Sequence, residues 1–93
     1  MISPSILEEF KERMKLSHSI EDVNLTNILS MSYVDLKARC GDFDIDKNRR
    51  GRELVFERSR YVYNDSLEFF EDYFLSEITS LGFELIGDLN EEQ

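Results

Sequence analysis

The stretch Leu25–Gly41, with the sequence LTNILSMSYVDLKARCG, decides the fold of this chain. Its apolar residues recur at intervals of three and four, which places them along one side of an α-helix. Gly41 follows the last of them, and glycine is typical of a helix end. Ser19 and Asp22 before the stretch are typical of a helix start. We therefore predict a helix over residues 20–40, and its apolar stripe consists of Leu25, Ile28, Leu29, Tyr33, Leu36 and Cys40.

Three further helices are predicted on either side of this one. Ser3 and Pro4 are typical of a helix start, and apolar residues at helical spacing follow, which predicts a helix over about 4–15. Two more helices are predicted over about 51–63 and 65–81, with a break at Asn64 and Asp65. In the last helix the apolar residues fall within a narrow arc that consists of Leu67, Phe70, Phe74, Ile78 and Leu81.

The remaining segments are predicted to lie outside helices. Residues 42–50 read as a polar loop, and Gly82 is expected to end the last helix. Residues 83–86 are expected to form a short extended piece, followed by an extended, flexible acidic tail over 87–93. With 41% hydrophobic residues in 93, the chain can form one small core. The fold class is therefore all-α, with about four helices in a small bundle that forms a single domain over residues 1–86.

Charge is distributed unevenly along the chain. Residues 1–60 hold 11 acidic and 11 basic side chains, whereas the residues after Arg60 hold nine acidic ones and no basic one. The whole net charge of -9 therefore belongs to the last third. An electrostatic field of one sign over part of a protein is informative about its partners rather than about its fold. It favours a surface that repels polyanions, imitates one, or docks on a basic partner, and the candidate acids are Asp65, Glu68, Glu71 and Asp72.

The densest group of bases lies in the loop before the third predicted helix, and it consists of Lys47, Arg49, Arg50 and Arg52. Such a loop could meet the acidic face of a neighbouring copy, remain solvated, or bind nucleic acid, although the net charge opposes the last. Asp42, Asp44, Asp46 and Glu53 have the spacing of a calcium loop. Lys47 stands where that loop needs glycine, so we predict no metal site.

Phe69 and Tyr73 lie off the main apolar arc of the fourth predicted helix. They are candidates for subunit contact, and the alternative is that they cover the edge of the core. His18 is the single histidine, and Cys40, the single cysteine, is expected to be a small buried residue. No arrangement of residues indicates catalysis or a cofactor.

The chain shows no signal for a membrane or for export. No apolar run approaches the roughly 18 residues that a membrane span requires. Glu8, Glu9 and Glu12 stand where a signal peptide would need a basic region and an apolar core. We expect a soluble protein that stays inside the cell that makes it.

The layout of the chain resembles that of the head–tail connector proteins, or head-completion adaptors, of long-tailed bacteriophages. The resemblance includes a helix whose apolar stripe ends at Cys40 and Gly41, a loop, and a helical second half. The stretch Gly51–Asp65, GRELVFERSRYVYND, is similar to the second half of this family. The similarity covers most of residues 5–86, and none of its motifs is catalytic.

The resemblance implies a structural protein of the virion, made in the cytoplasm of the host bacterium, and not an enzyme. Such proteins form a ring, generally of twelve subunits, beneath the portal protein, and they bind a stopper or tail-side protein below. DNA passes through the ring without specific binding. On this reading the four acids Asp65, Glu68, Glu71 and Asp72 line the channel. Phe69 and Tyr73, with the loop bases, would contact neighbouring subunits or the portal.

Two alternatives remain at this point. One is a DNA-mimic inhibitor, whose carboxylates take the place of phosphates in the groove of a DNA-binding protein. The other is a generic helical interaction module. A connector self-assembles or binds a ring-shaped portal, whereas a DNA mimic binds one copy of a basic protein.

Overall fold

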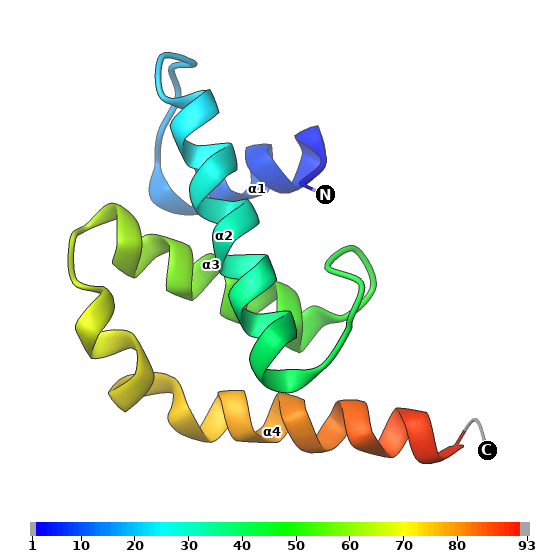
Figure 1. Cartoon of the computed structure of the whole chain (residues 1–93). Coiled ribbons are helices and arrows are strands. Elements are labelled where there is room, and N and C mark those ends of the chain that lie inside the picture. Colours follow the sequence, from blue (N-terminus) through cyan, green and yellow to red (C-terminus); the bar gives the residue numbers. More distant parts are fainter. Residues whose placement is uncertain (1, 92–93) are drawn as a thin grey trace.

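The computed structural model describes the backbone of residues 2–91 and the side chains of residues 2–87, and within that range the fold is all-α, as predicted (Figure 1). The α-helices are α1 (Pro4–Met14), α2 (Asp22–Cys40), α3 (Arg49–Tyr63) and α4 (Phe70–Glu91), and a short 3-10 helix, η1 (Leu67–Phe69), precedes α4. The prediction of about four helices in one small bundle is therefore confirmed.

Local contacts explain where α1 and α3 begin and where α2 ends. The predicted cap of α2 at Ser19 is wrong, because Glu21 precedes this helix and no side-chain hydrogen bond caps it. The Ser3 hydroxyl accepts a hydrogen bond from the Ile6 amide at 3.3 Å, and Asn48 caps α3 by accepting one from the Gly51 amide at 2.8 Å. Gly41 ends α2 with φ 113, in the region that favours glycine, so its predicted role is confirmed. Asp65 has φ 56 in the turn that separates α3 from η1, which confirms the predicted break.

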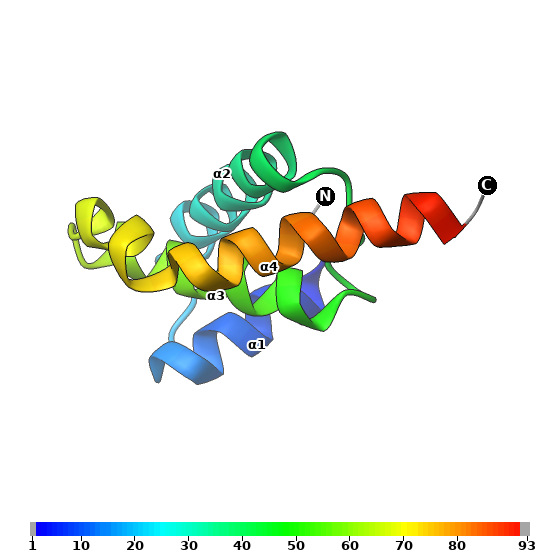
Figure 2. The ribbon, with the colours of Figure 1, turned by 90° about the horizontal axis from the view of Figure 1, so that it is seen from below.

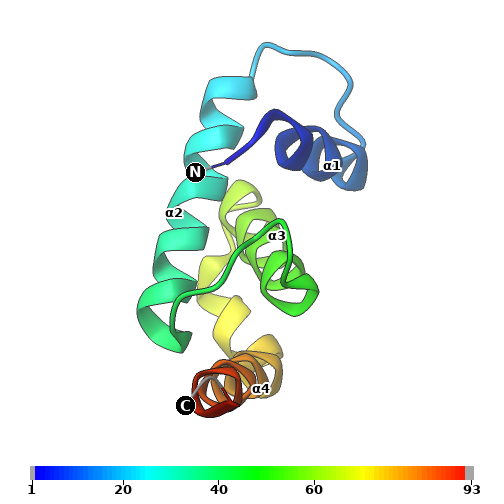
Figure 3. The ribbon, with the colours of Figure 1, turned by 90° about the vertical axis from the view of Figure 1, so that its right-hand side faces the viewer.

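The helix α3 lies at the centre of the molecule. Seen from below, α4 crosses in front of α3, with α2 and α1 on opposite sides (Figure 2). From the side, α2 forms one flank and α4 the lower end (Figure 3). Most of the predicted stripe of α2 is buried against this centre, whereas Ile28 and Cys40 are half-buried. The core includes Phe10, Leu25, Leu29, Leu36, Leu54, Val55, Phe56, Phe70, Ile78 and Leu81.

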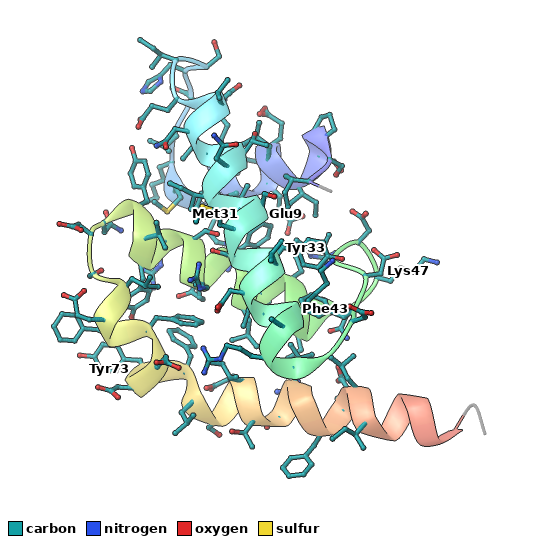
Figure 4. All side chains as sticks on the ribbon, viewed as in Figure 1. Glu9, Met31, Tyr33, Phe43, Lys47 and Tyr73 are labelled. Carbon is teal, nitrogen blue, oxygen red and sulfur yellow. The ribbon has the colours of Figure 1, made fainter. Side chains whose placement is uncertain are left out.

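The prediction of a polar loop over residues 42–50 is wrong at its end, because α3 begins at Arg49. It is also wrong for Phe43 and Ile45, because both are buried. The Tyr33 hydroxyl donates a hydrogen bond to the Phe43 carbonyl at 2.5 Å and accepts one from the Ile45 amide at 3.3 Å (Figure 4). The ring of Phe43 lies directly on Gly51, where a Cβ atom would collide with it. The loop is therefore held against the core by its alternate residues.

The predicted end of the last helix at Gly82 is also wrong. The backbone of α4 continues without interruption through Gly82, so residues 83–86 are helical rather than extended. Leu85 explains the continuation, because it is buried and packs over Gly41 at the end of α2. Burying a leucine stabilises by about 1.5–3 kcal/mol, which exceeds the roughly 1 kcal/mol that an interior glycine costs a helix. The predicted tail over 87–93 begins within this helix, and residues 92 and 93 lie outside the described residues.

Charged contacts join α1 to its neighbours. Lys11 Nζ lies 2.8 Å from Asp22 Oδ1 at the start of α2, and the hydrogen bond to this carboxylate raises the pKa of Lys11. Arg13 binds both carboxylate oxygens of Glu53 on α3, at 2.9 and 2.8 Å. Planar pairs of this kind fix orientation as well as distance. The short first helix is therefore positioned by ion pairs at its C-terminal end as well as by its buried residues.

Candidate interaction surfaces

The four predicted channel acids divide into two groups. Asp65, Glu68 and Asp72 are exposed on the turn, η1 and the first turn of α4, which form the yellow corner of Figure 1. None of the three forms an ion pair with a residue within the described part of the chain. Glu71 instead points to α2, where its carboxylate lies 2.5 Å from Arg39. Three acids thus form a negative corner without ion pairs, although Glu68 lines the same pocket as Arg39 and Arg58, and the fourth acid belongs to a contact between helices.

The predicted aromatic pair lies at the same corner. The rings of Phe69 and Tyr73 stack with centroids 6.3 Å apart, and the two residues are 49% and 66% exposed. Tyr61 contacts Tyr73 at 6.3 Å on one side and the rings of Phe70 and Phe74 on the other. The pair is therefore continuous with the core, yet more than half of the Tyr73 surface is available to a partner (Figure 4).

The four predicted loop bases do not form one patch. Arg50 lies 3.8 Å from Glu84 on α4. Arg52 donates hydrogen bonds to two loop carbonyls, at 3.4 and 3.3 Å, and lies 3.8 Å from Glu9. Lys47 points away from the helices in Figure 4. Contact with a partner therefore stays a prediction that rests mainly on Lys47 and on Arg49, which is exposed at the start of α3.

A groove of about 550 Å³ separates α3 from α4 near the loop. Its apolar residues are Leu54 and Phe74, and its charged residues include Arg50 and Glu84, which form the ion pair described above. Around the groove there are two arginines and four glutamates. It therefore presents mixed charge with an acidic excess rather than a site for an anion.

No group of three metal-ligating side chains occurs within residues 2–87. The carboxylate of Asp44, part of the calcium-like spacing, accepts a hydrogen bond from the Asp46 amide at 2.9 Å and so stabilises its own turn. Cys40 is half-buried, and burial raises the pKa of its thiol, which keeps it in the protonated, less reactive form. His18 is exposed in the segment before α2.

The structure reveals an uncharged outer face on α2 that sequence reasoning missed. It faces away from the core, and Val23 and Met31 on it are 77% and 68% exposed. Among the exposed residues of α2, only Arg39 carries a charge, and that residue is paired with Glu71. Isolated exposed apolar residues are normal, but a whole helix face without charge is not, in a chain with 33% charged residues. The α2 outer face consists of Val23, Asn27, Met31, Val34 and Ala38.

A second outer face lies on α4, on the side opposite its buried residues. Phe83 is 71% exposed there, and Leu75 and Ile86 are exposed beside it. Glu77 and Glu84, seven residues apart, lie on one side of α4, and that side lines the groove with α3 rather than the outer face. The α4 outer face consists of Leu75, Ser76, Thr79, Phe83 and Ile86, and the exposed Asp72 precedes it on the same side of the helix. The absence of charge from one side of α2, and from one side of α4 after Asp72, was the signal that could have identified both faces.

Comparisons of the chain with protein-family models, with curated proteins and with solved structures find no match. Within the described residues, no helix is both long enough and apolar enough to cross a membrane.

Proposed function

We propose that this protein is a structural subunit of a long-tailed phage virion, a head–tail connector that assembles as a ring beneath the portal. The observation that carries the proposal is the pair of exposed, uncharged outer faces on one small domain. A helix that is apolar on two sides is normally buried on both. We therefore expect protein partners to cover the α2 and α4 outer faces. In a ring of the connector type, neighbouring subunits would be those partners.

The negative corner fits the passage of DNA. Asp65, Glu68 and Asp72 are exposed and have no cationic partner among the described residues. Acidic walls repel phosphates, whereas basic walls bind the duplex by releasing its counterions. We propose that these three acids face the channel and that Glu71, which pairs with Arg39, does not contribute.

The same features argue against a DNA mimic. A mimic needs an array of free carboxylates that copies a row of phosphates. Here Glu71 and Glu84 are engaged by arginines of the same chain, and the uncharged faces would have no role.

Native mass tests the proposal. We would measure it by light scattering over a range of protein concentrations, alone and with a candidate portal protein. A large ring, alone or on the portal, is the expected result. A strict monomer that ignores the portal would overturn the proposal, and a one-to-one complex with a basic DNA-binding protein would favour the mimic.

Charge reversal tests the role of the corner. In the phage, Glu68→Lys combined with Asp72→Lys should leave the number of assembled particles unchanged and reduce the fraction of DNA ejected. Glu12→Lys combined with Asp42→Lys is the matched control, because both are exposed acids outside the corner and the change in net charge is the same. Ejection equal to that of the control would remove Glu68 and Asp72 from the channel wall.

A further inference from the structure

We infer that copies of this chain join head to tail, with the α4 outer face of one copy packed on the α2 outer face of the next. The inference rests on the proposed self-assembly and specifies the joint between neighbouring subunits, which neither the loop bases nor the aromatic pair identifies. Its basis is the match between the two faces in spacing, length and charge.

The two faces have the same pattern. Each has apolar residues at the first, third and fourth positions of an i, i+4, i+8, i+11 series, and a small uncharged polar residue at the second. Each series spans about 16 Å of helix, since a helix rises about 1.5 Å per residue. Two stripes of equal length and similar chemistry can pack along their whole length as a pair of helices. The series are Val23, Asn27, Met31 and Val34 on α2, and Leu75, Thr79, Phe83 and Ile86 on α4.

Charge opposes one of the two like pairings, that of α4 with α4. The residues after Arg60, which include α4, carry nine acids and no base, so an α4-to-α4 contact would bring together two surfaces of the same sign. The helix α2 contains two acids and two bases, so it presents no net charge to an approaching α4. The unlike pairing therefore avoids the repulsion of an α4-to-α4 contact. The cross-linking test below distinguishes it from an α2-to-α2 contact, which charge does not oppose.

The positions of the two faces suit a closed assembly. The faces point away from the core in different directions, because α2 forms one flank of the molecule and α4 its lower end (Figure 3). A copy can thus use α4 toward one neighbour and α2 toward the other, and such contacts make rings when the rotation closes. A joint of two three-turn stripes is smaller than the about 800 Å² per partner of stable complexes. We therefore expect assembly to depend on concentration and on closure of the ring.

Cross-linking between two single-cysteine variants tests the joint. In a Cys40→Ser background, Asn27→Cys places a thiol on the α2 outer face and Thr79→Cys places one on the α4 outer face. A short bismaleimide should link the two variants when they are mixed and should link neither variant to itself. Glu77→Cys replaces Thr79→Cys in the control, because Glu77 is exposed on the groove side of the same helix.

The outcomes separate this inference from the proposed function. Cross-links of either variant to itself, or mixed cross-links no stronger than in the Glu77→Cys control, would overturn the joint. If light scattering still showed a ring, the proposed function would stand without it. Absence of any assembly, alone or with portal, would overturn the proposed function itself.

A second measurement does not depend on cross-linking. Met31→Glu and Phe83→Glu each place a charge on one face, and both sites are exposed, so the monomer fold should be retained and can be checked by circular dichroism. Each should raise the concentration of half-assembly at least about tenfold, because an unpaired charge is costly in an apolar contact. Glu77→Gln, the control, should not raise it. Equal behaviour of all three variants would contradict the joint.

The dependence of assembly on salt concentration gives an independent test of the joint. Copies that carry -9 repel each other, so an apolar joint should strengthen as salt shortens the Debye length from about 10 Å at 0.1 M to about 3 Å at 1 M. A joint between loop bases and acids would weaken instead, which would refute the inference.

Discussion

Gly51 is the position at which the structure predicts the clearest response to a single methyl group. It is buried in the first turn of α3, beneath the ring of Phe43, and a Cβ atom there would collide with that ring. Gly82, inside α4, has open space around the same position. The pair of variants Gly51→Ala and Gly82→Ala therefore makes the same chemical change in a blocked and in an open environment.

The two substitutions should move stability in opposite directions. Alanine favours a helix by up to about 1 kcal/mol over glycine, and Gly82→Ala should gain about 0.5–1 kcal/mol. At Gly51 the same gain is opposed by overpacking, which costs about 1–3 kcal/mol. Movement of Phe43 also weakens its contact with the Tyr33 ring, whose centroid lies 5.2 Å away. We expect a net loss of about 0.5–2.5 kcal/mol for Gly51→Ala, which lowers Tm by about 4–8 °C for each kcal/mol.

The assay is denaturant and thermal unfolding of both variants, followed by circular dichroism at the helix band. The double variant Gly51→Ala with Phe43→Leu should lose less than the sum of the two single losses, because the smaller side chain leaves room for the added methyl. Stabilisation of Gly51→Ala by as much as Gly82→Ala would refute the placement of Phe43 on Gly51.

Three further predictions follow from the packing of the loop, the end of α4 and a tyrosine on α3. Tyr33→Phe leaves the buried carbonyl of Phe43 without its hydroxyl donor, so unfolding should become easier by about 1–3 kcal/mol, with faster amide exchange in the loop. Leu85→Ala should cost about 2–3 kcal/mol and expose the amides after Gly82 to exchange, whereas the exposed Leu75→Ala should cost less than about 0.5 kcal/mol. The Tyr63 hydroxyl donates a hydrogen bond to the carboxylate of Glu21, which raises the pKa of Tyr63 above its ordinary value of 10.0. The stability that this hydrogen bond contributes is therefore present below pH 10 and lost as the pH rises through the folded-state pKa of Tyr63. In Tyr63→Phe, the free energy of unfolding should depend less on pH between 8 and 11, as measured by denaturant unfolding.

The helices could be predicted from the sequence because each has a local signal. The apolar stripe of α2 and its end at Gly41 are visible without any knowledge of neighbouring elements. The two larger errors concern residues whose state depends on distant contacts. Phe43 and Ile45 alternate with acids, and their burial depends on the Tyr33 hydroxyl. Such alternation is a signal for an extended segment with one buried side, although its composition reads as polar.

Continuation of α4 through Gly82 is the second error, and its cause is tertiary. A glycine beside apolar residues resembles a helix end when only the local sequence is considered. Burial of Leu85 against the end of α2 outweighs that local preference. The α4 outer face follows from the same continuation, because Phe83 and Ile86 belong to it only if the helix persists.

The candidate surfaces were partly predictable for a different reason. Exposed acids can be recognised from charge alone, but the pairing of Glu71 with Arg39 requires the crossing of α4 and α2. The same holds for Arg50, whose partner Glu84 lies beyond the residue at which the helix was expected to end. Ion pairs between distant elements therefore decide which charges remain available to partners.

This internal pairing links the charge distribution to the mode of assembly. Nearly every arginine is engaged by an acid of its own chain, and the paired ones are Arg13, Arg39, Arg50, Arg52, Arg58 and Arg60. Most of the arginines that could have attracted a neighbour electrostatically are thus committed within the subunit, and Asp65, Glu68 and Asp72 form no ion pair among the described residues. A field of this sign disfavours contacts between the C-terminal thirds of two copies and disfavours contact with DNA, by the same Coulombic repulsion. Under the proposed function, one distribution of charge therefore keeps the channel free of bound DNA and directs subunits to join through their uncharged faces.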